Sequence, residues 1–272
     1  MSDPAAPAAL PPLVSATVER WPAKETTQDQ VAAEVPVSLV FNGIAHAVMM
    51  ATPQDLESFA LGFALSEGIL DSPVDCYGVE VETVQTLAVP CAAVQMEISA
   101  RCFARLKERR RSLVGATGCG LCGVESLDAL DLLLPPMAPQ AWLAQLPTGV
   151  LLAALAAMPQ RQVLNAACGA LHAAGWVRAD GVLTDVLEDV GRHNALDKLL
   201  GHLARADRLH EPGLVVMTSR ASYELVRKCA RLHIPALATI SAPTALAIQV
   251  AQAAGLTLWG LCRGEQAVRY CP

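Results

Sequence analysis

Roughly the last sixty residues of this chain alternate between short apolar runs and amphipathic stretches. The pattern predicts strands and helices in turn, over residues 214–218, 221–232, 236–240, 244–254 and 256–261. Short links between consecutive strands favour parallel pairing with right-handed crossovers. The sequence therefore predicts an α/β (α+β) fold with a mainly parallel sheet flanked by helices.

Polar segments follow the three predicted strands. Because the carboxyl ends of parallel strands meet at one edge of a sheet, these segments are expected to lie together. Two of them also begin helices, whose free N–H groups attract anions, and arginine is suited to phosphate. We therefore predict a site for a nucleotide or another phosphate-bearing ligand, although either arginine alone is equally compatible with a solvent-facing residue. The candidate residues are Ser219, Arg220, Ser241, Thr244, Leu261, Cys262, Arg263, Gly264 and Glu265.

Two turn motifs precede this alternation. Asn42-Gly43 and Asp180-Gly181 each separate two apolar runs and are typical of β-hairpins. The second hairpin leads into the polar segment 188–198, which continues as a helix. Within that segment, Arg192 and His193 are the next candidates for binding the anion.

Composition divides the chain into four parts. Thr52 is expected to cap a helix that ends at Gly68, within the first structured part. Prolines cluster near the start of the chain and again near its middle. The predicted parts are a disordered tail (1–30), an N-terminal α+β lobe that carries a cysteine motif (31–134), a proline-rich linker (135–147) and a larger C-terminal α/β lobe (148–272).

Cys119 and Cys122 lie three residues apart among the four glycines of residues 115–123. Glycine frees the backbone and leaves the thiols unshielded, which predicts a mobile loop that carries sulfur. The motif alone also fits a redox dithiol, half of a zinc site or a chance occurrence among nine cysteines. A structural zinc site needs two further ligands at suitable spacing, which no second motif supplies. Gly120 and Gly123 disfavour the helix on which a thioredoxin-like dithiol lies.

Charge and hydrophobicity exclude several classes of protein. A net charge of −6 argues against a general nucleic-acid surface. The longest apolar run, 150–158, is far shorter than the roughly 18 residues that span a membrane. Cysteines without framework spacing, and a start without a secretory signal, predict reduced thiols in the cytoplasm. The basic run 103–111 fits either a solvated helix face or a docking surface for an acidic partner.

Five motifs together resemble the FdhD/NarQ family, the formate dehydrogenase accessory sulfurtransferases. The resemblance extends from about residue 34 to residue 270. It implies a two-lobed fold, whose larger lobe is related to cytidine deaminases, and a homodimer. The motifs are 117–123 (TGCGLCG), 188–198 (EDVGRHNALDK), 219–224 (SRASYE), 241–244 (SAPT) and 262–264 (CRG).

The resemblance also implies a reaction. Sulfur would pass from a cysteine desulfurase to the molybdenum bis(guanine dinucleotide) cofactor before this cofactor enters formate dehydrogenase. Cys119 would carry the sulfur as a persulfide, and Cys122 would assist or resolve it. The guanine dinucleotide would occupy the carboxyl-edge site, where GDP is a surrogate. Two other functions stay open, a chaperone that escorts the cofactor without sulfur chemistry and a dithiol oxidoreductase.

The chain departs from the family at Cys168, which stands where the family tends to have the threonine of a Thr-Gly-Gly or Thr-Gly-Ala sequence ahead of a His-Ala-Ala motif. The role of a hydroxyl at that position is therefore open. Zinc-dependent deamination needs an H-x-E and a P-C-x-x-C motif. No H-x-E occurs here, and Gly118 precedes Cys119. Neither deaminase activity nor bound zinc is expected.

Overall fold

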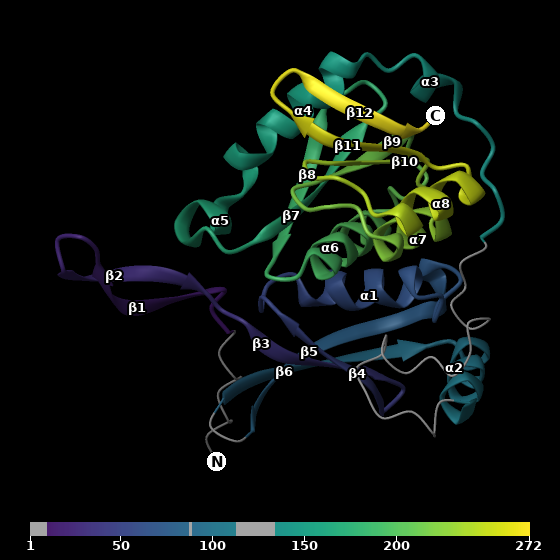
Figure 1. Cartoon of the computed structure of the whole chain (residues 1–272). Coiled ribbons are helices and arrows are strands. Elements are labelled where there is room, and N and C mark those ends of the chain that lie inside the picture. Colours follow the sequence, from purple (N-terminus) through teal and green to yellow (C-terminus); the bar gives the residue numbers. More distant parts are fainter. Residues whose placement is uncertain (1–9, 87–88, 113–133) are drawn as a thin grey trace.

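A computed structural model of the 272-residue chain describes residues 10–86, 89–112 and 134–272. Two β-sheets with their own hydrophobic cores make up most of this part, and a two-stranded hairpin projects from it (Figure 1). Among the described helices, none combines the length and the apolar character needed to cross a membrane.

The first sheet has four strands in the order β4-β3-β6-β5, with β3 and β6 parallel and the other neighbours antiparallel. Val37, Leu39 and Phe41 of β3 are fully buried in the core beneath α1. The predicted Asn42-Gly43 turn is confirmed, because both residues have the positive φ angles that it needs. The elements are β3 (Val35–Phe41), β4 (Ile44–Ala51), α1 (Leu56–Ser66), the 3-10 helix η1 (Pro73–Asp75), β5 (Cys76–Thr86), β6 (Val89–Ile98) and α2 (Ala100–Ser112).

The predicted start of α1 is wrong. Thr52 does not cap this helix; the cap position is Asp55, which has a left-handed φ of 54° and no capping hydrogen bond from its side chain. Thr52 is instead fully buried, and its backbone N–H donates to Asp189 Oδ2 at 3.0 Å. Its hydroxyl, the group that would cap a helix, accepts from the Val190 N–H at 3.2 Å. A contact with a residue far away in the sequence therefore overruled the local capping signal.

The second sheet has six strands in the order β12-β11-β10-β9-β7-β8. The predicted parallel pairing holds for β9, β10 and β11, but the other three neighbouring pairs are antiparallel. The prediction of a mainly parallel sheet is therefore wrong, and the sheet is mixed. Helices α6, α7 and α8 contribute to the core on one face, and α4 contributes to the core on the other. The elements are α3 (Ala141–Ala144), α4 (Thr148–Arg161), α5 (Val163–Cys168), β7 (His172–Arg178), β8 (Leu183–Asp189), α6 (Arg192–Arg205), β9 (Gly213–Met217), α7 (Tyr223–Arg231), β10 (Ala236–Thr239), α8 (Ala245–Ala254), β11 (Thr257–Arg263) and β12 (Gln266–Cys271).

Helices α1 and α6 pack against each other between the two sheets (Figure 1). Gly62 of α1 and Gly201 of α6 make this close approach possible. A Cβ atom on Gly62 would lie 1.8 Å from the Asp197 carbonyl oxygen, and one on Gly201 would lie 1.8 Å from that of Ser58. Any larger residue at either position would push the helices apart.

The prediction of a disordered tail over residues 1–30 is wrong for its described part. Residues 13–32 form an antiparallel hairpin of β1 (Leu13–Arg20) and β2 (Glu25–Ala32). Threonine and valine are frequent in both strands and favour extended backbone. Proline content alone therefore misled the prediction.

The proline-rich segment 135–147, predicted as a linker, is attached to the second sheet's helical layer. It contains α3, and the Met137 N–H donates to the Ala254 carbonyl at the end of α8, at 2.9 Å. The Met137 side chain also packs against the core beneath α8.

Candidate functional site

The amino ends of α6 and α7 meet at the edge of the six-stranded sheet where β8, β9, β10 and β11 end. His193 in α6 has its Nε2 2.9 Å from Glu224 Oε2 and 3.4 Å from Ser222 Oγ. Burial lowers the pKa of His193, and this effect outweighs the negative charge of Glu224, which raises the pKa. The positive charge of Arg192 lowers it further. The imidazole is therefore neutral at pH 7, and it donates its Nε2–H to Glu224 while Nδ1 stays an acceptor.

Arg192 and His172 form the basic part of this edge. The Nε of Arg192 is buried and has no hydrogen-bond partner among the described residues. His172, the first residue of β7, has its pKa lowered by burial and by the charge of Arg192. A buried donor without a partner is costly, so an acceptor atom of a bound ligand would stabilise Arg192.

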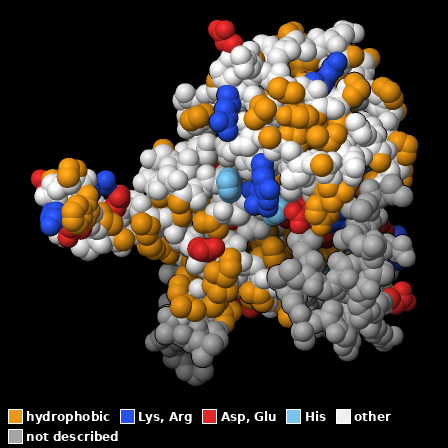
Figure 2. Space-filling view, in the orientation of Figure 1, with side chains coloured by type: hydrophobic (Ala, Val, Ile, Leu, Met, Phe, Trp, Pro, Cys, Tyr) orange, Lys and Arg blue, Asp and Glu red, His pale blue; other side chains and the backbone are white. Residues whose placement is uncertain are grey.

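The three predicted loops lie side by side at the same edge. The Ser241 N–H donates to the Ser219 carbonyl at 3.3 Å, and Arg263 donates through Nη2 to Ser241 Oγ at 3.2 Å. The guanidinium of Arg220 is exposed and has no ion-pair partner in the described part of the chain. Figure 2 shows histidine, basic and acidic side chains next to one another near the middle of this face.

Several predicted ligands have side chains that are already engaged. Cys262 lies within β11, not after it, and its side chain points into the core, where burial raises the pKa of the thiol to about 11. The Ser219 hydroxyl is buried and donates to the Arg220 carbonyl at 3.1 Å. Thr244 caps α8, its side chain accepting from the Ala247 N–H at 3.2 Å. For Cys262, only the backbone is placed to meet a ligand.

The β11–β12 turn presents the other predicted residues of this segment. Arg263 is the last residue of β11, and its Nε also donates to the Ile240 carbonyl at 3.0 Å. Leu261 and Gly264 both have positive φ angles, which turn the chain sharply there. Leu261, Gly264 and Glu265 are exposed. The turn is therefore accessible to a ligand through Leu261, Arg263 and Glu265.

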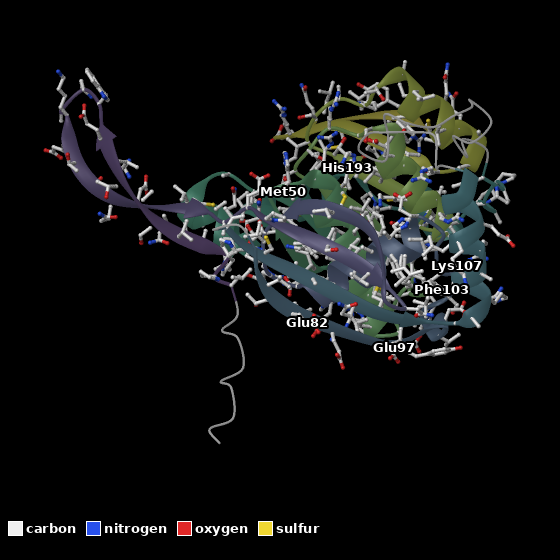
Figure 3. All side chains as sticks on the ribbon, turned by 90° about the horizontal axis from the view of Figure 1, so that it is seen from below. Met50, Glu82, Glu97, Phe103, Lys107 and His193 are labelled. Carbon is white, nitrogen blue, oxygen red and sulfur yellow. The ribbon has the colours of Figure 1, made fainter. Side chains whose placement is uncertain are left out.

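Most of the polar segment 188–198 serves a different purpose. Fully buried Lys198 lies 2.7 Å from Asp189 Oδ2 and donates to the Thr52 and Glu188 carbonyls at 3.0 and 3.1 Å. Asn194 Nδ2 donates to the Met50 carbonyl at 2.8 Å, and Figure 3 shows Met50 close to His193. These bonds join the end of β4 in the first sheet to the end of β8 in the second.

Sequence reasoning missed Ser222, Glu224 and His172 as site residues. The first two stand in the motif 219–224, but nothing local showed that Glu224 faces α6. Cys119 and Cys122, the predicted sulfur carriers, lie outside the described residues.

A group of possible metal ligands, Asp71, Asp75 and Cys102, lies away from this edge. Arg101 contacts the two carboxylates at 2.7 and 3.2 Å, and Arg105 contacts Asp71 at 2.9 Å. The guanidinium groups thus already neutralise these acids. Since no ion is needed for that, this group gives no reason to assign a metal.

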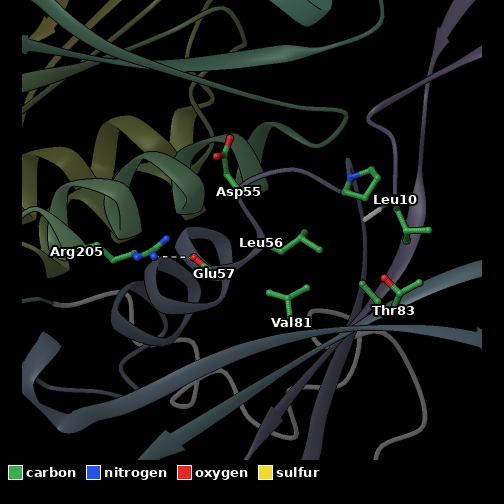
Figure 4. Close-up of a pocket in the computed structure, with 9 residues that line it drawn as sticks. Leu10, Asp55, Leu56, Glu57, Val81, Thr83 and Arg205 are labelled. Carbon is green, nitrogen blue, oxygen red and sulfur yellow. Dashed lines mark ion pairs between the residues drawn. The ribbon is translucent and has the colours of Figure 1, made fainter. Parts of the chain in front are cut away.

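A cavity of about 410 Å³ lies between the start of α1 and strands β5 and β6 (Figure 4). Helix α1 and strand β5 both have 11 residues, but a helix rises only about 1.5 Å per residue and a strand about 3.3 Å. The helix therefore covers only part of the sheet, which leaves room for the cavity. Leu56 and Val81 line its apolar part, and an ion pair of 2.6 Å between Glu57 and Arg205 lies at its rim. None of the predicted site residues lines it.

Comparison with known proteins gives consistent matches. The model of the FdhD/NarQ family matches residues 32–272. The sulfur carrier protein FdhD of Burkholderia mallei (strain ATCC 23344) is 50% identical over 253 residues, which cover 92% of each chain. The protein of the same name from Cupriavidus necator is 51% identical over 255 residues, 93% of this chain and 86% of the relative.

A solved structure also matches. It comes from Desulfotalea psychrophila and was assigned to the formate dehydrogenase accessory proteins. The match covers 96% of this chain and 98% of that chain, with a TM-score of 0.69 and 22% sequence identity. It shows that the two proteins share a mixed α/β fold.

Proposed function

Because the chain belongs to the FdhD/NarQ family, we propose that it is a sulfur carrier that serves the maturation of formate dehydrogenase. The observation that carries this proposal is a sequence identity of 50–51%, over 92–93% of the chain, with relatives named sulfur carrier protein FdhD. Neither a cofactor chaperone without sulfur chemistry nor a dithiol oxidoreductase is favoured by those names. The protein acts in the cytoplasm as a homodimer.

Cys119 is the sulfur-carrying residue in this proposal. Its thiolate attacks the outer sulfur of a persulfide on a cysteine desulfurase. One sulfur–sulfur bond forms and one breaks, the desulfurase cysteine leaves as a thiolate, and no net oxidation occurs. In delivery to the molybdenum bis(guanine dinucleotide) substrate, a second thiolate attacks the inner sulfur of the persulfide and forms a disulfide with Cys119, and the outer sulfur leaves as sulfide for the substrate. A cellular thiol then reduces the disulfide. Cys122, three residues on, assists the transfer or resolves the persulfide.

The nucleotide part of that substrate binds at the carboxyl edge of the six-stranded sheet. Support comes from two converging helix N-termini and from the partnerless Nε of Arg192 and exposed guanidinium of Arg220. A net charge of −6 means that the diphosphate must be held by such a local site. The proposal includes a two-lobed architecture in which this sheet belongs to a lobe related to cytidine deaminases. Its support is the strand order and the parallel pairing of the central strands β9, β10 and β11.

Sulfur loading tests the proposed function directly. Wild-type protein is incubated with a cysteine desulfurase and cysteine, desalted without reductant and weighed by intact-mass spectrometry. We expect a species heavier by one sulfur atom, which reductant removes because a persulfide is reducible. Omitting cysteine gives the control. Failure to acquire sulfur from an active desulfurase would exclude the carrier role.

Arg263→Ala is expected to weaken GDP binding about tenfold to a hundredfold, because a charge-assisted hydrogen bond contributes roughly 1.5–3 kcal/mol. Isothermal titration calorimetry measures the affinities of wild type and variant. Arg269→Ala is the matched control, since Arg269 is exposed on the same β11–β12 hairpin but pairs with Trp259, farther from the edge. Equal affinities for Arg263→Ala and wild type would place the phosphates nearer Arg192 and Arg220.

A further inference from the structure

The two ring nitrogens of His193, in the first turn of α6, have different surroundings (Figure 3). Nε2 faces α7, where it lies 2.9 Å from Glu224 Oε2 and 3.4 Å from Ser222 Oγ. Nδ1 makes no hydrogen bond to any residue that the structure describes, and 26% of the side chain is exposed. One nitrogen is therefore engaged by the protein, and the other is open to a ligand.

Glu224 determines which of the two nitrogens carries the proton. A carboxylate only accepts hydrogen bonds, and this one also accepts from the Ser222 hydroxyl at 3.3 Å. Nε2 therefore holds the proton that it donates to Glu224, which leaves Nδ1 of the neutral ring with a lone pair and no hydrogen. Such an atom accepts a hydrogen bond from a hydroxyl or an N–H group, whereas it repels a phosphate oxygen.

The charges around His193 keep its ring neutral. Burial is the largest cause of its lowered pKa; Glu224 opposes the lowering, and the cations Arg192 of α6 and Lys228 of α7 add to it. His172, which reaches this edge from β7, has its pKa lowered by burial and by Arg192 as well. Neither histidine therefore supplies positive charge, and the phosphates of a ligand must be held by arginines.

We propose that His193 is a specificity-determining residue of the nucleotide site, where it accepts a hydrogen bond from an uncharged donor of the nucleotide. The donor is a ribose hydroxyl or an N–H group of the guanine base. A ligand without that donor binds more weakly, because it covers Nδ1 and removes its water without giving a hydrogen bond in return. That a nucleotide binds at this edge rests on the proposed function, whereas the kind of contact follows from the two ring nitrogens.

Isothermal titration calorimetry with GDP and with inorganic pyrophosphate tests this contact. His193→Gln keeps an amide donor near the position of Nε2, so it still reaches Glu224, but it has no atom at the position of Nδ1. We expect this variant to bind GDP about twofold to tenfold more weakly than wild type, which is the usual contribution of one neutral hydrogen bond. Pyrophosphate has neither ribose nor base, so wild type and variant should bind it equally.

A third ligand, 2′,3′-dideoxy-GDP, identifies the donor. If a ribose hydroxyl donates to Nδ1, wild type and His193→Gln bind this analogue equally; if the base donates, the variant stays weaker. His193→Asn makes the converse change, because its Oδ1 takes the position of Nδ1 while no donor reaches Glu224. It should keep the dependence on the donor that His193→Gln loses, which separates a lost acceptor from a disturbed α6–α7 contact.

His202→Gln is the matched control on the same helix. His202 lies in the last turn of α6, is 44% exposed and also faces a carboxylate, with its Nε2 3.1 Å from Asp185 Oδ1. The same substitution there removes a carboxylate-paired imidazole at the end of the helix away from the site. His202→Gln should therefore bind GDP and pyrophosphate like wild type.

The number of protons taken up on binding distinguishes an acceptor from a cation. Calorimetry at pH 7 in two buffers of different ionisation enthalpy measures this number, which should be the same for wild type and His193→Gln. An additional proton taken up by wild type, an equal loss of affinity for GDP and pyrophosphate, or unchanged GDP binding by His193→Gln would overturn the proposal. Absence of GDP binding to wild type would overturn the nucleotide site together with this contact. Sulfur loading is measured without nucleotide, so failure of the carrier role remains distinguishable.

Discussion

Cys119→Ala is expected to leave the protein unable to accept sulfur and to leave cells that depend on it without active formate dehydrogenase. The physical reason is that only a thiolate can attack the donor persulfide and hold the transferred sulfur atom. Intact-mass analysis after sulfur loading and formate-dependent dye reduction in complemented cells measure the two losses.

Cys91→Ala is the control for this substitution. Cys91 is partly exposed in β6, so it tests whether any accessible thiol contributes. Its loss should leave both readouts at the wild-type level. Cys122→Ala separates the two open roles of that residue. Loss of an assisting thiol would slow sulfur loading, whereas loss of a resolving thiol would slow sulfur delivery. Full sulfur loading and full formate dehydrogenase activity with Cys119→Ala would remove Cys119 from the mechanism.

Lys198→Met should lower the free energy of unfolding by about 3–5 kcal/mol, which is the usual cost of breaking a fully buried ion pair. Lys198 and Asp189 are both 0% exposed, and their contact of 2.7 Å is supported by two carbonyl acceptors. Methionine has similar volume but leaves Asp189 charged without its cation. Since a domain is stable by only about 5–15 kcal/mol, urea unfolding should show a much lower midpoint.

Arg205→Met gives the matched control on the same helix. Arg205 pairs with Glu57 at 2.6 Å, but the side chains are 49% and 45% exposed. Solvent screening should keep its loss within about 1 kcal/mol. The double variant Lys198→Met with Asp189→Asn should recover part of the lost stability, because it removes the unpaired charge. Equal, small effects of Lys198→Met and Arg205→Met would show that the buried pair does not join the two sheets energetically.

The secondary structure of the C-terminal half was predictable because its signals are local. Apolar runs separated by amphipathic stretches indicate β9, α7, β10, α8 and β11, and turn residues mark the β7–β8 hairpin. The meeting of the strand-end loops follows from parallel pairing alone. Local signals failed where a distant residue competed for the same group, as at Thr52, whose hydroxyl accepts from the Val190 N–H and does not cap α1.

The meeting of the predicted loops at one edge of the sheet follows from the sequence, but the directions and contacts of their side chains do not. Arg220 and Arg263 lie at the predicted edge, but Cys262 points into the core because the strand continues through it. His172 and Glu224 could not be assigned from spacing, because each meets the site from a different element. Which side chain faces a ligand depends on where strands end and on how helices are rotated, and both are settled by packing.

The sequence by itself determined the β/α alternation, the turns at Asn42-Gly43 and Asp180-Gly181, and the family motifs, since these depend on neighbours along the chain. Only the tertiary structure decided that Gly62 and Gly201 let α1 and α6 touch and that Lys198 joins the two sheets. It also decided that a proline-rich start becomes a projecting arm. The physical reason is that close helix packing and burial of a charge require groups far apart in sequence, whose meeting no local pattern records.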